Sequence, residues 1–218
     1  MNTRSRPQRS KYFLLLPLFV LLPLPLIAAD AAITYRRVFK SSSPEFIEVK
    51  LGEGGACVYD IRQLDDDPSP QTCELGAPLR KKIFELAAQL NYFRDLQLDV
   101  RRRIANLGEK TFRYEHGGQT HQVHFNYTIN ATANQMMQIF EGIARQQEHL
   151  VKLQRRMKYD RLGVNDALLQ FETDLNRKII PEPERLLPTL EQIAGDLHFQ
   201  DIARQRARAL AERTRTGK

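Results

Sequence analysis

The segment Thr111–Tyr127, which reads TFRYEHGGQTHQVHFNY, decides the fold that this sequence predicts. Apolar and polar residues alternate on both sides of Gly117-Gly118, a two-residue connection that is typical of a primed β-turn. If these glycines form the loop, three pairs of residues face each other: His116 with Gln119, Tyr114 with His121, and Phe112 with Val123. One face of this antiparallel hairpin then carries Phe112, Tyr114, His116, His121, Val123, Phe125 and Tyr127.

An earlier part of the chain has the same organisation. The segment Phe46–Leu51 alternates with Ile47, Val49 and Leu51 on one side, as a half-buried strand requires. After the turn at 52–55, the segment Ala56–Ile61 returns as a second strand, and the segment Ile33–Lys40 predicts a further strand before both. The glycine-rich turn lacks the Lys-Ser/Thr ending and the following helix of a phosphate-binding loop, so we interpret it as a hairpin turn.

A helix follows each predicted hairpin. Pro78 opens an amphipathic helix that runs to Leu90, and Asn130 or Thr132 caps a longer one that runs to about Asp160. The phrase KIFELAAQ at 82–89 is similar to QIFEGIAR at 138–145, which suggests two β-β-α units. The sequence therefore predicts an α+β fold, with a small antiparallel sheet of two β-hairpins and helices on one of its faces.

Apolar residues at helical spacing continue to the end of the chain. They predict one helix from Val164, capped by Asn165 after a break at Gly163, and further helices over 186–197 and 199–210. Short connections favour an antiparallel helical hairpin or bundle. We therefore expect an α+β domain over 32–160 and a C-terminal helical region with a basic tail over 161–218. No element is assigned to 92–108.

The N-terminal residues predict export. Arg4, Arg6, Arg9 and Lys11 precede an uncharged apolar run over 12–29, which is the arrangement of a signal peptide. Three prolines interrupt this run, and it is shorter than the roughly 20 residues of a membrane span. We expect residues 1–31 to be a signal peptide cut between Ala31 and Ala32, with a second possible site after Ala29. The alternative is an uncleaved anchor that holds the protein in the inner membrane through residues 12–29. Either reading places the body in the periplasm or outside the cell.

The charge of the chain gives weak support for a polyanionic partner. The formal net charge of +7 falls to +4 for the 187 residues after position 31, which hold 29 basic and 25 acidic residues. The remaining excess lies in the tail, where six basic residues stand against Glu212: Arg204, Arg206, Arg208, Arg213, Arg215 and Lys218. Such a tail could touch nucleic acid, lipid or cell-wall polyanions, but a solvated helix face is the more common explanation. We expect no specific nucleic-acid partner.

Cys57 and Cys73 are the only two cysteines of the chain. In an exported protein such a pair predicts a disulfide, which would hold an acidic, turn-rich loop in place. A redox site is the alternative, but the CxxC spacing is missing. A catalytic thiol would need a base that the sequence does not place nearby.

Other candidates for chemistry are weaker. His116, His121 and His124 suggest zinc, yet the predicted register turns His124 to the opposite face, and no fourth ligand is evident. Asp65, Asp66 and Asp67 lack the spacing of an EF-hand and are typical of turns. The chain contains no GxSxG, HExxH, P-loop or Rossmann motif. We therefore assign no catalytic, cofactor-binding or metal-binding residue.

The β-β-α order, with Phe112-Arg113-Tyr114-Glu115 before the second turn, resembles emfourin-type inhibitors of metalloproteases. The resemblance covers residues 34–145 at most and assigns no site residue. It implies inhibition of a secreted metalloprotease as one possible function. The leading expectation is a non-enzymatic module, exported or membrane-anchored, that binds an unknown protein partner. An enzyme without a recognisable motif is the third possibility.

Overall fold

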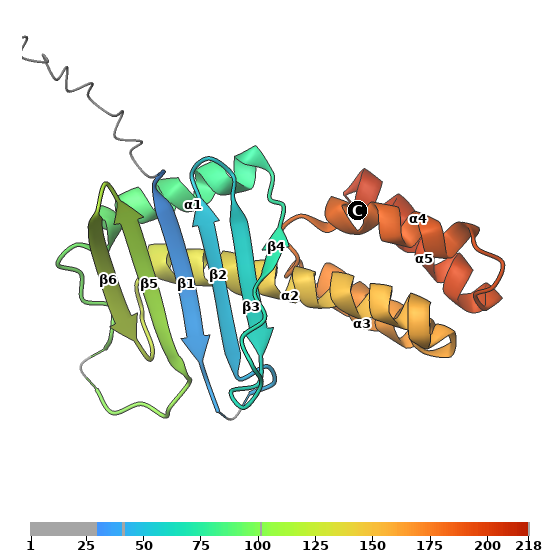
Figure 1. Cartoon of the computed structure of the whole chain (residues 1–218), viewed down its shortest axis with the longest axis horizontal. Helices are drawn as coiled ribbons and strands as arrows, with labels where there is room; N and C mark the ends of the chain where they lie inside the picture. Colours follow the sequence, from blue (N-terminus) through green and yellow to red (C-terminus); the bar gives the residue numbers. More distant parts are fainter. Residues whose placement is uncertain (1–29, 41, 101, 218) are drawn as a thin grey trace, which may run out of the picture.

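In the described part of the chain, six antiparallel strands form one sheet, and five α-helices complete the fold (Figure 1). The computed structural model describes residues 30–40, 42–100 and 102–217. The strands are β1 (Ala32–Val38), β2 (Phe46–Gly52), β3 (Cys57–Arg62), β4 (Gln71–Cys73), β5 (Glu109–His116) and β6 (Gln119–Phe125). The helices are α1 (Ala77–Gln89), α2 (Ala131–Tyr159), α3 (Val164–Asn176), α4 (Leu187–Gly195) and α5 (Asp201–Thr216). Short 3-10 turns are η1 (Asn91–Phe93), η2 (Arg161–Gly163) and η3 (Pro183–Leu186). The predicted α+β class with a C-terminal helical part is confirmed.

The hairpin of β5 and β6 has the predicted register. His116 pairs with Gln119, Tyr114 with His121 and Phe112 with Val123. Gly117 and Gly118 have φ values of 56° and 78°, which glycine adopts without the steric cost of a Cβ atom. The local turn chemistry therefore sets which side chains of the hairpin face the core.

The sheet is wider than two hairpins side by side. Its strand order is β4-β3-β2-β1-β5-β6, so β1 lies between the two hairpins and pairs with both β2 and β5. Ile33 and Tyr35 of β1 are fully buried, which gives this strand a central position. The short strand β4 was not predicted, because its three residues lie in a segment rich in turn-forming residues.

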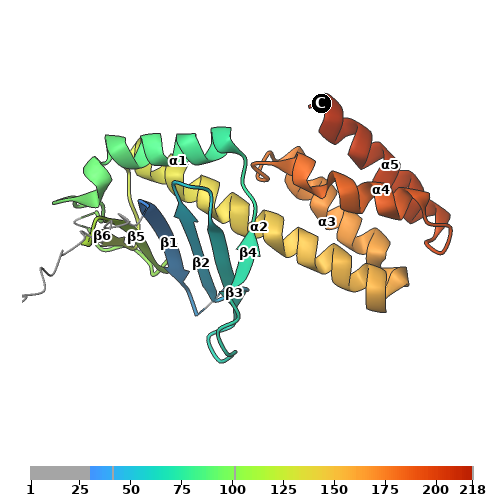
Figure 2. The same ribbon diagram turned by 45° about the horizontal axis from the view of Figure 1, so that its top comes forward.

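Helices α1 and α2 cover one face of the sheet, and the other face is open (Figure 2). On the covered face, the Tyr35 hydroxyl donates to Glu141 of α2 at 2.5 Å, and Arg37 donates to the same carboxylate at 3.1 Å. Burial raises the pKa of Tyr35 well above its ordinary value. The open face is polar, with Arg36, Lys50 and Arg113 exposed.

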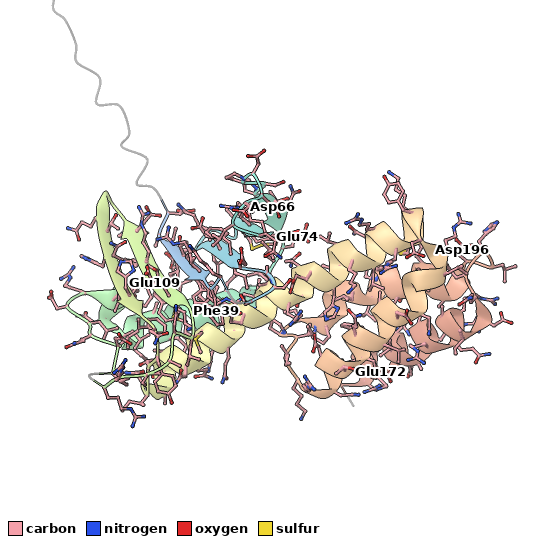
Figure 3. The ribbon with its side chains drawn as sticks, turned by 90° about the horizontal axis from the view of Figure 1, so that it is seen from below. Phe39, Asp66, Glu74, Glu109, Glu172 and Asp196 are labelled. Atoms are coloured by element: carbon pink, nitrogen blue, oxygen red, sulfur yellow. A yellow bond between two sulfur atoms is a disulfide. The ribbon has the colours of Figure 1, made fainter. Side chains whose placement is uncertain are left out.

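Helix α2 belongs to both halves of the molecule. Its first half, including Met136 and Phe140, packs in the core beneath the sheet. Leu153 packs in a second core with the three C-terminal helices, together with Leu168 and Leu190. Figure 3 shows α2 running from the sheet into the helical part as one continuous rod.

The ends of the helices agree only in part with the sequence predictions. Asn130 caps α2, since its side-chain oxygen accepts from the backbone N–H of Ala133 at 2.9 Å. The predicted cap at Asn165 is wrong, because Asn165 lies inside α3. The turn before α3 is instead closed by Asp160, whose carboxylate accepts from the backbone N–H of Gly163 at 3.0 Å.

The predicted signal or anchor over 12–29 lies outside the described residues. Of the predicted cleavage site, Ala31 is buried and Ala32 is the first residue of β1. Within the described ranges, the structure contains no helix with the length and apolar character of a membrane span.

The described part of the basic tail is the helix α5. Each of its arginines makes a polar contact with a neighbouring element or within its own helix: Arg204 with Asp201, Arg206 and Arg213 with Glu172, Arg208 with the Ala194 carbonyl, and Arg215 with Glu191. These contacts hold α5 against α3 and α4. The arginines of the tail therefore help to pack α5 within the helical region.

Candidate binding groove

An open groove with a volume of about 1220 Å³ separates the β4 edge of the sheet from the second half of α2. One wall consists of β3, β4 and the loop before β4, and the other wall consists of α2 from Arg145 onward. In Figure 3, Glu74 lies beside α2 at this edge, and Asp66 lies farther from the helix. The floor includes Tyr59, Ile61 and Leu150, so the groove combines apolar and polar surfaces.

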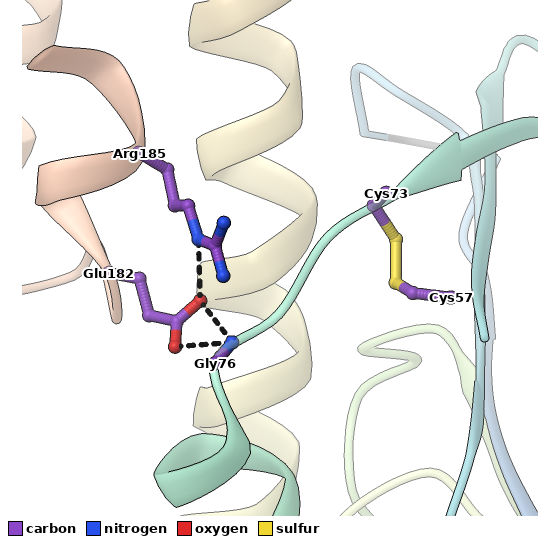
Figure 4. The surroundings of a disulfide bond; sticks show 5 residues. All are labelled: Cys57, Cys73, Gly76, Glu182 and Arg185. Carbon is purple, nitrogen blue, oxygen red and sulfur yellow. Dashed lines mark hydrogen bonds and ion pairs between the residues drawn. A yellow bond between two sulfur atoms is a disulfide. The ribbon is translucent and has the colours of Figure 1, made fainter. Parts of the chain in front are cut away.

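The strand wall of the groove ends in an edge strand. β4 pairs with β3 and has no second partner strand among the described residues. The predicted disulfide is present between Cys57 of β3 and Cys73 of β4, whose Cα atoms are 4.9 Å apart (Figure 4). Gln71 and Thr72 are exposed. The disulfide therefore fixes a very short edge strand whose outer side is open to solvent.

Arg62 holds the loop that leads to β4. Its guanidinium donates to the carboxylate of Asp60 at 3.0 Å and to the backbone carbonyl of Asp66 at 3.0 Å. It also lies over the ring of Phe46, with its Cζ atom 4.3 Å from the ring centroid. The carboxylate of Asp66 accepts from the backbone N–H of Gln63 at 3.1 Å, as expected for an aspartate in a turn.

The helix wall of the groove is mainly basic, with Arg145, Lys152, Arg155 and Arg156 against Glu148 and Asp160. Arg156 pairs with Asp160, while Arg145 lies 3.2 Å from Glu148 and 3.4 Å from Asp174. Burial raises the pKa of Glu148. Lys152 donates only to the amide of Gln170, and Arg155 makes no ion pair within the described residues. Lys152 and Arg155 are therefore the cations of this wall that form no close ion pair with a described residue.

His149 forms the one pair on this wall that resembles part of a catalytic site. Its Nε2 atom lies 2.9 Å from Asp174 of α3, and its ring contacts Phe171 edge-on. Burial lowers the pKa of His149, although Asp174 acts in the opposite direction. Both cysteines are in the disulfide, and in the described part of the chain no hydroxyl hydrogen-bonds to this imidazole. His149 and Asp174 therefore form a buried link between α2 and α3.

A second contact joins the helical region to the sheet close to the disulfide. The carboxylate of Glu182 accepts from the backbone N–H of Gly76, the residue before α1, at 2.8 and 3.1 Å (Figure 4). Arg185 lies 3.6 Å from the same carboxylate, and Gln146 of α2 accepts from the backbone N–H of Glu182. These contacts set the position of the helical region relative to β4.

The three histidines considered for zinc lie where the predicted register puts them. The Nδ1 atom of His124 lies 2.9 Å from the Thr111 hydroxyl on the open face of the sheet. His121 lies on the covered face beside Arg94. Within the described residues, no group of three or more His, Cys, Asp or Glu side chains could hold a metal ion.

Sequence reasoning missed the groove because its two walls are far apart in the chain. The spacing of Lys152, Arg155 and Arg156 on one helix was a usable signal, but nothing local connects it to Gln71 and Thr72. A module that binds a protein partner should expose an apolar patch on its helical half, over 161–218, and this patch stays a prediction. Three strongly exposed aliphatic residues lie on that half: Leu162, Leu197 and Ile202.

No family model matches the chain, and no curated protein matches it. The resemblance to emfourin-type inhibitors therefore stays a prediction.

Proposed function

We propose that this chain is a non-enzymatic binding module, exported or anchored in the inner membrane, that holds an extended polypeptide segment in the groove between β4 and α2. The observation that carries the proposal is the combination of an open edge strand with a facing basic helix. A polypeptide can add to an edge strand through main-chain hydrogen bonds, while side-chain pockets select its sequence. The groove offers both kinds of contact.

The charges of the groove favour an acidic segment. Lys152 and Arg155 line the groove and form no close ion pair with another described residue. Carboxylates on one side of an added strand would lie opposite α2, and the alternate residues would point the other way. Complementary charge of this kind mainly raises the association rate and the specificity.

Fluorescence anisotropy with defined peptides tests the proposal. The probe is a labelled peptide that alternates Glu with Val, and its comparison peptide alternates Lys with Val. The full chain in a non-ionic detergent should bind the acidic peptide and not the basic one. Hydrogen exchange should show new protection at Gln71–Cys73, because the added strand would pair with β4.

A matched pair of double variants separates the groove from general charge. Lys152→Glu with Arg155→Glu should weaken binding at least about tenfold, since both groove cations are reversed. Lys82→Glu with Arg103→Glu makes the same change in net charge at two exposed positions away from the groove and should bind normally. Equal weakening in both double variants, or no binding of the acidic peptide, would contradict the proposal.

A further inference from the structure

The connection between α1 and β5 begins with a left-handed turn that contains no glycine. The φ values are 50° at Asn91, 48° at Tyr92, 64° at Phe93 and 52° at Asp95. Residues with a Cβ atom rarely adopt this conformation, because the Cβ atom approaches the next carbonyl oxygen. Strained backbone persists only where the surroundings fix it, and it occurs often at ligand sites.

Phe93 fixes this turn. Its ring is buried and stacks on Phe112 of β5, with centroids 5.4 Å apart and planes at 18°. Since Phe93 points inward, its neighbours Tyr92 and Arg94 remain at the surface on either side. The Tyr92 ring lies against the ring of Tyr114, with centroids 4.5 Å apart. The turn thus places an aromatic and a cationic side chain beside the end of the β5–β6 hairpin.

These side chains line a cavity of about 330 Å³ together with His116, His121 and two amide side chains. No carboxylate lines this cavity. The only polar side-chain partner of Arg94 in the described part of the chain is Nε2 of His121 at 3.3 Å. Burial and Tyr92 raise the pKa of Tyr114, and Glu53 is the nearby acid that contributes to this shift. The cavity is therefore lined by one fixed positive charge, that of Arg94, and by the imidazoles of His116 and His121.

We infer that this cavity, formed by Tyr92, Arg94, Tyr114, His116 and His121, binds a small ligand through a carboxylate or phosphate group. The guanidinium of Arg94 donates to Nε2 of His121 and carries further N–H groups that can bind one oxyanion, and arginine suits bidentate binding of such groups. The tyrosine rings offer an apolar surface for the remainder of the ligand. This site is separate from the proposed groove, and its occupancy does not depend on a polypeptide partner.

The five histidines of the chain provide the test, by NMR of their imidazole carbons. The full chain in a non-ionic detergent is titrated with inorganic phosphate and, in a second arm, with acetate, at constant ionic strength. The signals of His116 and His121 should shift and saturate, while that of His124 on the opposite face should not. The arm with the tighter saturation identifies the preferred group. Linear shifts in both arms, or equal shifts of all five histidines, would overturn the inference.

Three variants make the test specific. Arg94→Gln should weaken the binding at least about tenfold, because the fixed charge and its paired donors are lost. Arg113→Gln removes a cation from the open face of the same hairpin and should bind as the unchanged chain does. His121→Gln is the second probe, for use if the Arg94 variant fails to fold. It should also weaken the binding. Unchanged affinity in a folded Arg94 or His121 variant would contradict the assignment.

Discussion

The carboxylate of Glu182 lies 2.8 Å from the backbone nitrogen of Gly76, although the two residues are 106 positions apart. Glu182 comes from the connection between α3 and η3, and Gly76 comes from the connection between β4 and α1. The contact places a negative charge at the N-terminal end of α1, where the helix dipole favours it. It is one of the few polar links between the sheet and the helical region.

Glu182→Ala should lower the free energy of unfolding by about 2–4 kcal/mol, because a buried charged acceptor is removed and the Gly76 N–H loses its partner. Urea denaturation followed by circular dichroism measures this change. Glu184→Ala is the matched control, because Glu184 is exposed in the same segment and should change the value by less than about 0.5 kcal/mol. Similar losses for both variants would show that Glu182 has no special role.

Loss of the disulfide should destabilise the protein and its edge strand. The bridge joins residues separated by 16 positions, which corresponds to about 3 kcal/mol in the chain-entropy model. Reductant should therefore shift the unfolding transition of the normal chain, and should not shift that of a Cys57→Ser, Cys73→Ser variant. If β4 needs the bridge, the same variant should also bind the acidic peptide more weakly.

Mild acid should destabilise the fold through His149. Burial lowers the pKa of the folded imidazole below its ordinary value of 6.5, so unfolded His149 takes up a proton at a higher pH than folded His149. At a pH between the pKa of folded His149 and that of unfolded His149, the unfolded state binds more protons than the folded state. The free energy of unfolding therefore falls as the pH falls.

His149→Gln keeps a hydrogen-bond donor for Asp174 and removes the titrating group. Between about pH 7.5 and about pH 5.5, it should lose less stability than the unchanged chain, because its unfolded state no longer takes up this proton. Denaturation at both pH values measures the difference. An equal loss in the His149 variant and the unchanged chain would exclude His149 as the cause.

The predicted cleavage before Ala32 should affect the stability of the fold. The buried carbonyl of Ala31 accepts from the backbone N–H of Glu53 at 2.7 Å. A chain that begins at Ala32 lacks this bond and carries a charged amino group at the start of β1. It should be about 1–3 kcal/mol less stable than a chain that begins at Asp30.

Intact mass of protein from the native host shows which residue comes first, and denaturation of the two recombinant forms measures the difference between them. A mass that falls two hydrogens short of the reduced form would also report the disulfide. Equal stability of the two forms would contradict the role given to Ala31.

The sequence by itself determined the elements whose signals are local. The two glycines at 117 and 118 fixed the register of β5 and β6, and the side chain of Asn130 marked the start of α2. The two cysteines, in a chain that we expect to be exported, predicted their bridge. For the turn and the cap, the energy that decides the structure comes from residues close in the chain, through turn sterics and capping.

Only the tertiary structure decided the features that join distant segments. The placement of β1 between the hairpins depends on burying Ile33 and Tyr35 beneath α2, and the groove exists because α2 continues past the β4 edge. The left-handed turn at Tyr92 is against local preference and is held by the stacking of Phe93 on Phe112. Such choices follow from burial and packing summed over the whole chain, which no local pattern records.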